Sequence, residues 1–187
     1  NWACCMCRSG LRPRAARWCT VEIEKTELDN LLLITLEPFQ DFRGGFIELY
    51  NKQAYMEQGI GQEFVEDDLN VSTKGVLKGF HADSAAWKLL TCLFGEIYLV
   101  VVDCQESAPT FGKWQAFTLA ADNLIQLLVP PNYGIAHLVL GLTAWLHYKQ
   151  TEYYDRSRQS TYRWDDPRFG VRWPIQHPIL SRRDESC

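Results

Sequence analysis

The sequence predicts an all-β protein, a jelly roll with only short peripheral helices. Short apolar segments recur from residue 21 onward, and turn-forming residues separate them. Only residues 52–59 in the front half have a good helical composition, and that stretch is short. Many evenly spaced strands with turns between them are typical of a barrel or sandwich, and the open mouth of a jelly roll often holds a ligand.

Each predicted strand is rich in leucine, β-branched or aromatic side chains. In chain order the predicted strands are residues 31–36, 45–50, 75–81, 88–94, 96–102, 114–119, 123–129, 135–140 and 143–150. The connections contain glycine or proline, which interrupt strands most often. They are Arg43-Gly44-Gly45, Gly95, Ser107-Ala108-Pro109-Thr110, Pro130-Pro131-Asn132-Tyr133-Gly134 and Leu140-Gly141.

Residues 1–19 differ from the rest of the chain. Four arginines lie there among cysteines and small residues, with no acidic residue. A cleaved targeting segment needs a continuous apolar stretch, which this segment lacks. We expect a disordered leader over residues 1–19, or sequence foreign to the native start, followed by a single domain over residues 20–187.

Composition and charge exclude several classes of protein. The chain has 187 residues, of which 47% are hydrophobic, enough for one well-buried core. A formal net charge of -4 argues against a nucleic-acid-binding surface. The longest apolar run, residues 97–102, is too short to cross a bilayer. We therefore expect a soluble, cytoplasmic protein with neither a nucleic acid nor a membrane as its partner.

The cysteines do not predict a metal site. Cys4 and Cys7 have zinc-like spacing, but a structural zinc site needs a second ligand pair, and none lies nearby. The other five are Cys5, Cys19, Cys92, Cys104 and Cys187.

Two segments carry side chains suited to proton transfer. His81 ends the strand-like run of residues 74–81, and Lys88 follows one short turn later. Tyr148 lies in the strand predicted over residues 143–150. A base, a cation and a weak acid can remove a proton next to a carbonyl, hold the enolate and return a proton to the opposite face. This combination predicts an isomerase.

The residues alone leave a structural alternative open for each of these side chains. A lone histidine at a strand end is more often structural than catalytic. Lys88 either turns outward to water or faces a polar pocket, because a buried, unpaired ammonium is costly. Tyr148 also fits a packing tyrosine on the apolar face of its strand.

Several longer motifs occur in the same order as in a known family. They include Asp41-Phe42-Arg43-Gly44-Gly45-Phe46-Ile47-Glu48, Lys74-Gly75-Val76-Leu77-Lys78-Gly79-Phe80-His81, Lys88-Leu89-Leu90, Ala136-His137, His147-Tyr148-Lys149, Trp164-Asp165-Asp166-Pro167 and Leu180-Ser181-Arg182-Arg183-Asp184. From about residue 31 to residue 184 the chain resembles the dTDP-4-dehydrorhamnose 3,5-epimerase family. The members of this family are metal-free cupins, whose fold is a double-stranded β-helix.

The resemblance implies a role for each catalytic candidate. His81 would be the general base, and Asp184 the carboxylate paired with its second ring nitrogen. Lys88 would hold the C4 oxyanion, and Tyr148 would protonate the opposite face. No metal or cofactor is implied.

The resemblance also implies a substrate and a homodimer. Arg43 and Lys78 match positions that hold the diphosphate of a nucleotide-linked 4-keto-deoxysugar, in deoxysugar or polysaccharide biosynthesis. The segment from residue 43 to 48 would reach toward the neighbouring subunit. The other expected substrate contacts are Glu48, Glu66, Asp68, His137, Tyr154 and Arg183.

The nucleotide and the sugar stay open. Where the family has Gln-Asp-Asn, this chain has Glu66-Asp67-Asp68, and carboxylates suit a ligand edge rich in N–H groups, such as guanine. A GDP- or CDP-linked 4-keto heptose or deoxysugar is therefore an alternative to dTDP-4-dehydro-6-deoxyglucose.

Two alternatives come from other classes of function. His81, Asp83 and His137 have the form of the two-histidine, one-carboxylate triad of Fe(II) oxygenases. That hypothesis leaves Lys88, Tyr148 and Asp184 without roles. A sugar-nucleotide-binding protein without catalysis would lack the base or the acid, and both are present here.

Overall fold

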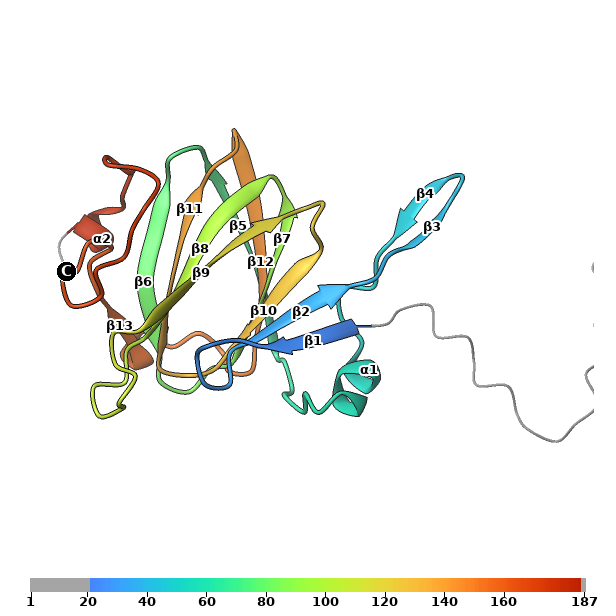
Figure 1. The fold of residues 1–187 in the computed structure, drawn as a ribbon, viewed down its shortest axis with the longest axis horizontal. Coiled ribbons are helices and arrows are strands. Elements are labelled where there is room, and N and C mark those ends of the chain that lie inside the picture. Colours follow the sequence, from blue (N-terminus) through green and yellow to red (C-terminus); the bar gives the residue numbers. More distant parts are fainter. Residues whose placement is uncertain (1–20, 186–187) are drawn as a thin grey trace, which may run out of the picture.

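Two antiparallel β-sheets face each other in this computed structural model, which describes residues 21–185 (Figure 1). A two-stranded hairpin, β3 (Phe39–Asp41) with β4 (Gly44–Phe46), projects away from them (Figure 1). The architecture is the predicted all-β jelly roll, a double-stranded β-helix with short peripheral helices. The leader expected over residues 1–19 lies outside the described residues.

The larger sheet has six strands in the order β1-β2-β10-β7-β12-β5. These strands are β1 (Val21–Lys25), β2 (Leu32–Leu36), β10 (Ile125–Val129), β7 (Lys88–Phe94), β12 (Thr143–Gln150) and β5 (Glu66–Thr73). Most neighbours in this order are far apart in the chain. The sheet therefore places side chains from distant segments in adjacent rows.

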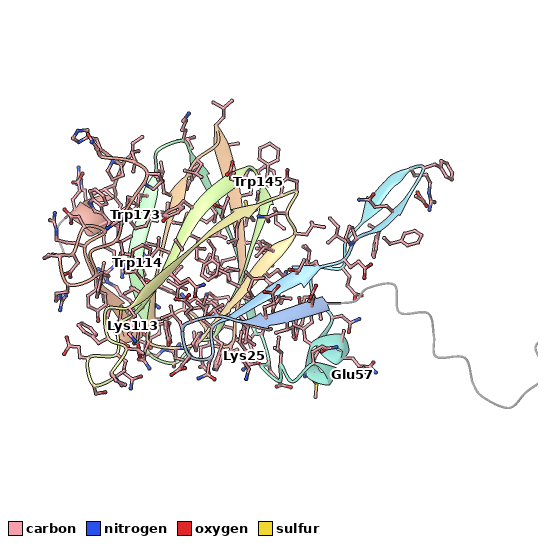
Figure 2. The ribbon with its side chains drawn as sticks, viewed as in Figure 1. Lys25, Glu57, Lys113, Trp114, Trp145 and Trp173 are labelled. Atoms are coloured by element: carbon pink, nitrogen blue, oxygen red, sulfur yellow. The ribbon has the colours of Figure 1, made fainter. Side chains whose placement is uncertain are left out.

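The smaller sheet has five strands in the order β13-β6-β11-β8-β9. They are β13 (Gln159–Thr161), β6 (Leu77–Asp83), β11 (Tyr133–Val139), β8 (Glu96–Asp103) and β9 (Trp114–Ala120). Trp173, labelled in Figure 2, packs against Phe80 and Tyr98 on this sheet. The C-terminal segment thus covers part of its outer face.

The main core fills the space between the sheets. Leu99 on β8, Leu119 on β9 and Leu127 on β10 are completely buried there. Burying leucine stabilises the fold by about 1.5 to 3 kcal/mol per side chain.

The helices are short and peripheral. Helix α1 (Lys52–Glu57) begins at Asn51, whose side chain accepts a hydrogen bond from the Ala54 N–H. Its Tyr55 is buried against the outer face of the larger sheet, where its hydroxyl donates to Gln126. The others are the 3₁₀ turn η1 (Arg156–Arg158) and α2 (Arg182–Glu185). No helix within residues 21–185 is long and apolar enough to span a membrane.

Most strand predictions are confirmed, and two, residues 88–94 and 143–150, have the predicted ends. The prediction over residues 45–50 is only partly right, because β4 ends at Phe46. Beyond it, the Leu49 carbonyl accepts side-chain hydrogen bonds from Gln126 and Tyr55 in place of strand pairing. Four strands were not predicted: β1, β3, β5 and β13.

Strand β5 escaped prediction because its alternation is inverted. Its polar side chains, such as Asn70 and Ser72, face inward, while Leu69 and Val71 are exposed. Hydrophobic periodicity identifies a strand whose apolar face is buried, and here the buried face is polar.

We predict that Leu99→Ala lowers the free energy of unfolding by about 2 to 5 kcal/mol, because it leaves a cavity between the sheets. Urea denaturation followed by circular dichroism measures this. The control is Leu142→Ala, since Leu142 is 87% exposed and its truncation should change stability by less than about 0.5 kcal/mol. Equal losses in both variants would contradict the placement of the core.

Candidate active site

A pocket opens between the two sheets, and both sheets contribute to its lining. Its charged and polar side chains come from five strands and include His81, Lys88 and Tyr148. The lining residues are Asn70, Lys78, His81, Lys88, Leu90, Ile135, His137, Leu146 and Tyr148. The structure therefore brings the predicted base, cation and acid into one cavity.

His81 and Asp184 form a hydrogen-bonded pair at this pocket. His81 lies on β6, and its Nε2 is 2.7 Å from Oδ1 of Asp184 on α2. Asp184 is only 2% exposed, and its other oxygen accepts a hydrogen bond from the Ser181 hydroxyl at 2.8 Å. Because an ionised carboxylate can only accept, Nε2 carries the hydrogen, and the lone pair of a neutral His81 lies on Nδ1.

Asp184 stays ionised although it is buried. Burial by itself would raise its pKa, but the hydrogen bonds from His81 and Ser181 outweigh that effect and leave the pKa of Asp184 lowered. The charged carboxylate fixes the tautomer of His81 and would stabilise an imidazolium. Such a pair is suited to abstracting a proton.

Lys88 places an ammonium beside the Tyr148 ring. Its Nζ lies 5.7 Å from the ring centroid, and no hydrogen bond or ion pair to residues 21–185 occupies it. Burial lowers the pKa of Lys88, while the charges of Asp83, Asp68 and Glu66 oppose that shift. The ammonium is therefore available to an anion in the pocket.

Tyr148 presents a phenol that keeps its proton. Burial, followed by the negative charges of Asp68 and Glu66, raises the pKa of Tyr148 to about 12. At neutral pH the hydroxyl is protonated, which is the state a general acid requires.

Lys78 and His137 line the pocket on neighbouring strands, paired in register between β6 and β11. The Lys78 Nζ donates to Asn70 Oδ1 at 2.9 Å. Burial, and then the charges of Lys78 and His81, lower the pKa of His137 to about 4. His137 is therefore a neutral imidazole at physiological pH.

Glycine is required at position 79, between Lys78 and Phe80. Its φ is +111°, and a Cβ there would lie 2.3 Å from the Ile135 carbonyl oxygen. The close approach of β6 to β11 therefore depends on Gly79.

Six expected substrate contacts do not line the pocket within this chain. Arg43 pairs with Asp41 on the projecting hairpin, with 73% of its side chain exposed. Arg183 donates to the Thr161 hydroxyl next to the pocket wall. Glu48 accepts a hydrogen bond from Asn51, and Glu66 and Asp68 both accept hydrogen bonds from Gln150. Tyr154 is 55% exposed, and its N–H donates to Glu66.

The triad of the oxygenase alternative is not assembled. The carboxylate of Asp83 accepts hydrogen bonds from the backbone of Ala85 and Ala86 and from the Gln159 side chain. No three metal-ligating side chains gather at any point of residues 21–185. That alternative is therefore wrong about the placement of Asp83, which shapes the turn before Lys88 instead.

Sequence reasoning missed several residues of the site. Asn70, Leu90, Ile135 and Leu146 line the pocket, and Gln150 donates to Glu66 and Asp68, two of the three carboxylates of β5. Recognising β5 as a strand with a polar inner face would have identified Asn70. The three apolar residues follow only from knowing which side of each strand faces the pocket.

Comparison with known proteins assigns the family. Residues 25–187 match the family model described as dTDP-4-dehydrorhamnose 3,5-epimerase. The chain is similar to the dTDP-4-dehydrorhamnose 3,5-epimerase of Shigella flexneri, with 37% identity over 169 residues, covering 88% of this chain and 93% of that protein.

Solved structures of similar proteins support the same family assignment. A Legionella pneumophila dTDP-6-deoxy-D-glucose-3,5-epimerase in complex with dTDP-4-keto-L-rhamnose has a TM-score of 0.83 and 34% identity, covering 88% of this chain and 90% of that one. The Bacillus anthracis dTDP-4-dehydrorhamnose 3,5-epimerase with TDP and PPi bound has a TM-score of 0.85 and 33% identity, covering 89% and 98%. With this fold and this pocket, the chain belongs to the dTDP-4-dehydrorhamnose 3,5-epimerase family of isomerases.

Proposed function

We propose that the protein inverts C3, C5 or both in a dTDP-linked 4-keto-6-deoxy sugar, through an enolate. The His81–Asp184 hydrogen bond, in the same pocket as Lys88 and Tyr148, is the observation that carries this proposal. The names of the similar proteins support dTDP as the nucleotide and a 4-keto sugar as the substrate.

His81 removes the proton. The lone pair on Nδ1 takes the hydrogen from the carbon next to the ketone, and the C–H electrons move onto the C4 oxygen. Asp184 stabilises the imidazolium that forms. Lys88, whose ammonium makes no hydrogen bond or ion pair with residues 21–185, holds the C4 oxyanion.

Tyr148 returns a proton to the same carbon from the opposite face. This inverts the carbon and re-forms the ketone, while the tyrosinate is reprotonated from water and His81 releases its proton. The raised pKa of Tyr148 favours return of its proton from water between turnovers. In this proposal Lys78 and His137, which both line the pocket, bind the diphosphate, Lys78 as a charged donor and His137 as a neutral donor.

We also propose that the protein acts as a homodimer. Phe94, Trp145 and Val71 lie in one row across β7, β12 and β5, and all are more than two-fifths exposed, at 52%, 43% and 55%. Exposed apolar patches of this kind mark interfaces. The turn of the projecting hairpin carries Phe42, which is 98% exposed, and Arg43. In the proposed dimer, Arg43 and Glu48 reach the pocket of the second copy.

We predict that His81→Ala lowers the rate of solvent deuterium exchange next to the ketone by about 10²- to 10⁴-fold, because it removes the base. Asp184→Asn should also lower it strongly, because it removes the charge that stabilises the imidazolium. NMR of dTDP-4-dehydro-6-deoxyglucose in D₂O measures the exchange, with GDP- and CDP-linked 4-ketosugars as alternative substrates. His177→Ala is the control, since His177 is exposed and outside the pocket. Wild-type exchange in His81→Ala would refute the assignment of the base.

We predict that Tyr148→Phe still exchanges deuterium but produces little epimerised sugar, because the enolate forms and its protonation from the opposite face fails. The same NMR assay reports both quantities. Tyr153→Phe, which removes a hydroxyl from a residue 71% exposed, should leave both unchanged. Equal inversion in Tyr148→Phe and wild type would show that another group is the acid, with Tyr154 the next candidate.

We predict that Trp145→Glu weakens the dimer, because it places a charge in the exposed row on β12. Sedimentation velocity should show a dimer for the wild type and mostly monomer for the variant. Ile179→Glu is the control, because Ile179 is 58% exposed beside Val76, away from that row. A monomeric wild type would contradict the proposed assembly.

A further inference from the structure

Two carboxylates lie next to the acid and the cation of the pocket. Glu66 and Asp68 are on β5, directly opposite Gln150 and Tyr148 on β12. The Gln150 Nε2 donates to Glu66 Oε1 at 2.8 Å and to Asp68 Oδ2 at 2.9 Å. Gln150 is itself 2% exposed, so the amide holds the two acidic side chains in fixed positions.

These carboxylates already have donors within the protein. The second oxygen of Glu66 accepts the N–H of Tyr154 at 3.0 Å, so three of the four carboxylate oxygens have a partner. A pair built chiefly to contact a ligand would leave its acceptors open. The hydrogen bonds point to a role inside the site.

The cation lies on the other side of β12. Lys88 on β7 pairs in register with Gln150, and its ammonium lies 5.7 Å from the centroid of the Tyr148 ring. Strand β12 thus presents the phenol between a positive charge on β7 and two negative charges on β5. The other charged or titratable groups that act on Lys88 or Tyr148 are Asp83 at the end of β6 and Tyr154 after β12.

The charges of Glu66 and Asp68 act to raise the pKa of both Lys88 and Tyr148. Burial lowers the pKa of Lys88, and Asp83, Asp68 and Glu66 counteract it. Burial raises the pKa of Tyr148, and Asp68 and Glu66 raise it further. The two carboxylates also affect each other. Burial raises the pKa of Asp68, and the hydrogen bond with Glu66 and the negative charge of Glu66 raise it further.

We propose that Glu66 and Asp68, held together by Gln150, are positioning residues that keep Lys88 charged and Tyr148 protonated, and so set the alkaline limit of turnover. The inference rests on the proposed function, because it assigns the two carboxylates a role in that same reaction. Without them, the buried ammonium would lose its proton at a lower pH, and the phenol would ionise more readily.

The test compares isosteric variants over pH 7 to 11. Asp68→Asn and Glu66→Gln each remove one charge but keep an oxygen that accepts from Gln150. We expect the alkaline limb of kcat for epimerisation to shift about one pH unit lower in each. A residue that only supports the fold would lower kcat without moving the limb.

Asp67→Asn is the matched control. Asp67 lies between the two carboxylates on β5 but on the outer face, where it pairs with Lys149 at 2.6 Å and its side chain is 56% exposed. This variant loses the same charge and should keep the wild-type alkaline limb. The proposal is overturned if the limb stays in place in Asp68→Asn and Glu66→Gln, or moves equally in Asp67→Asn.

A second readout does not need turnover. The ionisation of Tyr148 is followed by NMR of protein labelled with ¹³Cζ-tyrosine, with the signal assigned by its loss in Tyr148→Phe. We expect Tyr148 to ionise at lower pH in Asp68→Asn and Glu66→Gln than in wild type, and unchanged ionisation would overturn the inference. If wild type epimerises none of the 4-ketosugars, the proposed function fails, while this titration still decides the role of the pair.

Discussion

Strand β12 pairs with β7 on one side and with β5 on the other, and the register of these two ladders determines the chemistry of the pocket. On the inner face, one row contains Lys88, Gln150 and Glu66, and the next row on that face contains Leu90, Tyr148 and Asp68. A slip of one residue in either ladder would turn the charged side chains to the opposite face. The cation, the phenol and the carboxylates are therefore neighbours because of backbone pairing, although they come from three separate segments of the chain.

The interior must hold these polar groups without losing stability. Buried carboxylates and amides are costly unless hydrogen bonds satisfy them. Asp184 is satisfied by His81 and Ser181, and Asp83 by the turn after β6 and by Gln159. Lys88 differs, because no hydrogen bond to residues 21–185 satisfies its ammonium. A substrate oxyanion therefore gains most by binding to the Lys88 ammonium, because the neighbouring buried polar groups already have hydrogen-bond partners.

On strand β5 of the larger sheet, the outer face carries apolar side chains and the inner face carries polar ones. Leu69 and Val71 are exposed on β5, opposite the face that carries Asp68 and Asn70. Helix α1 covers the part of the outer face near β2 and β10, and the part near β12 stays open. We propose that the inner face of β5 serves the reaction and that its outer face contacts a second copy of the chain.

The sequence alone determined the all-β class, most strands and the principal side chains of the site. Local apolar segments and turn residues are enough to locate strands such as β7 and β12, and the family motifs pointed to His81, Lys88, Tyr148 and Asp184. Only the tertiary structure decided which of the expected residues share a pocket. Strand β5 and Gln150 depend on which face of a strand is buried, a property set by packing between sheets, and Arg43 lies on a hairpin that projects away from the pocket of its own chain (Figure 1). Local sequence carries the preference for a strand, whereas the surroundings of each face depend on contacts between residues far apart in the chain.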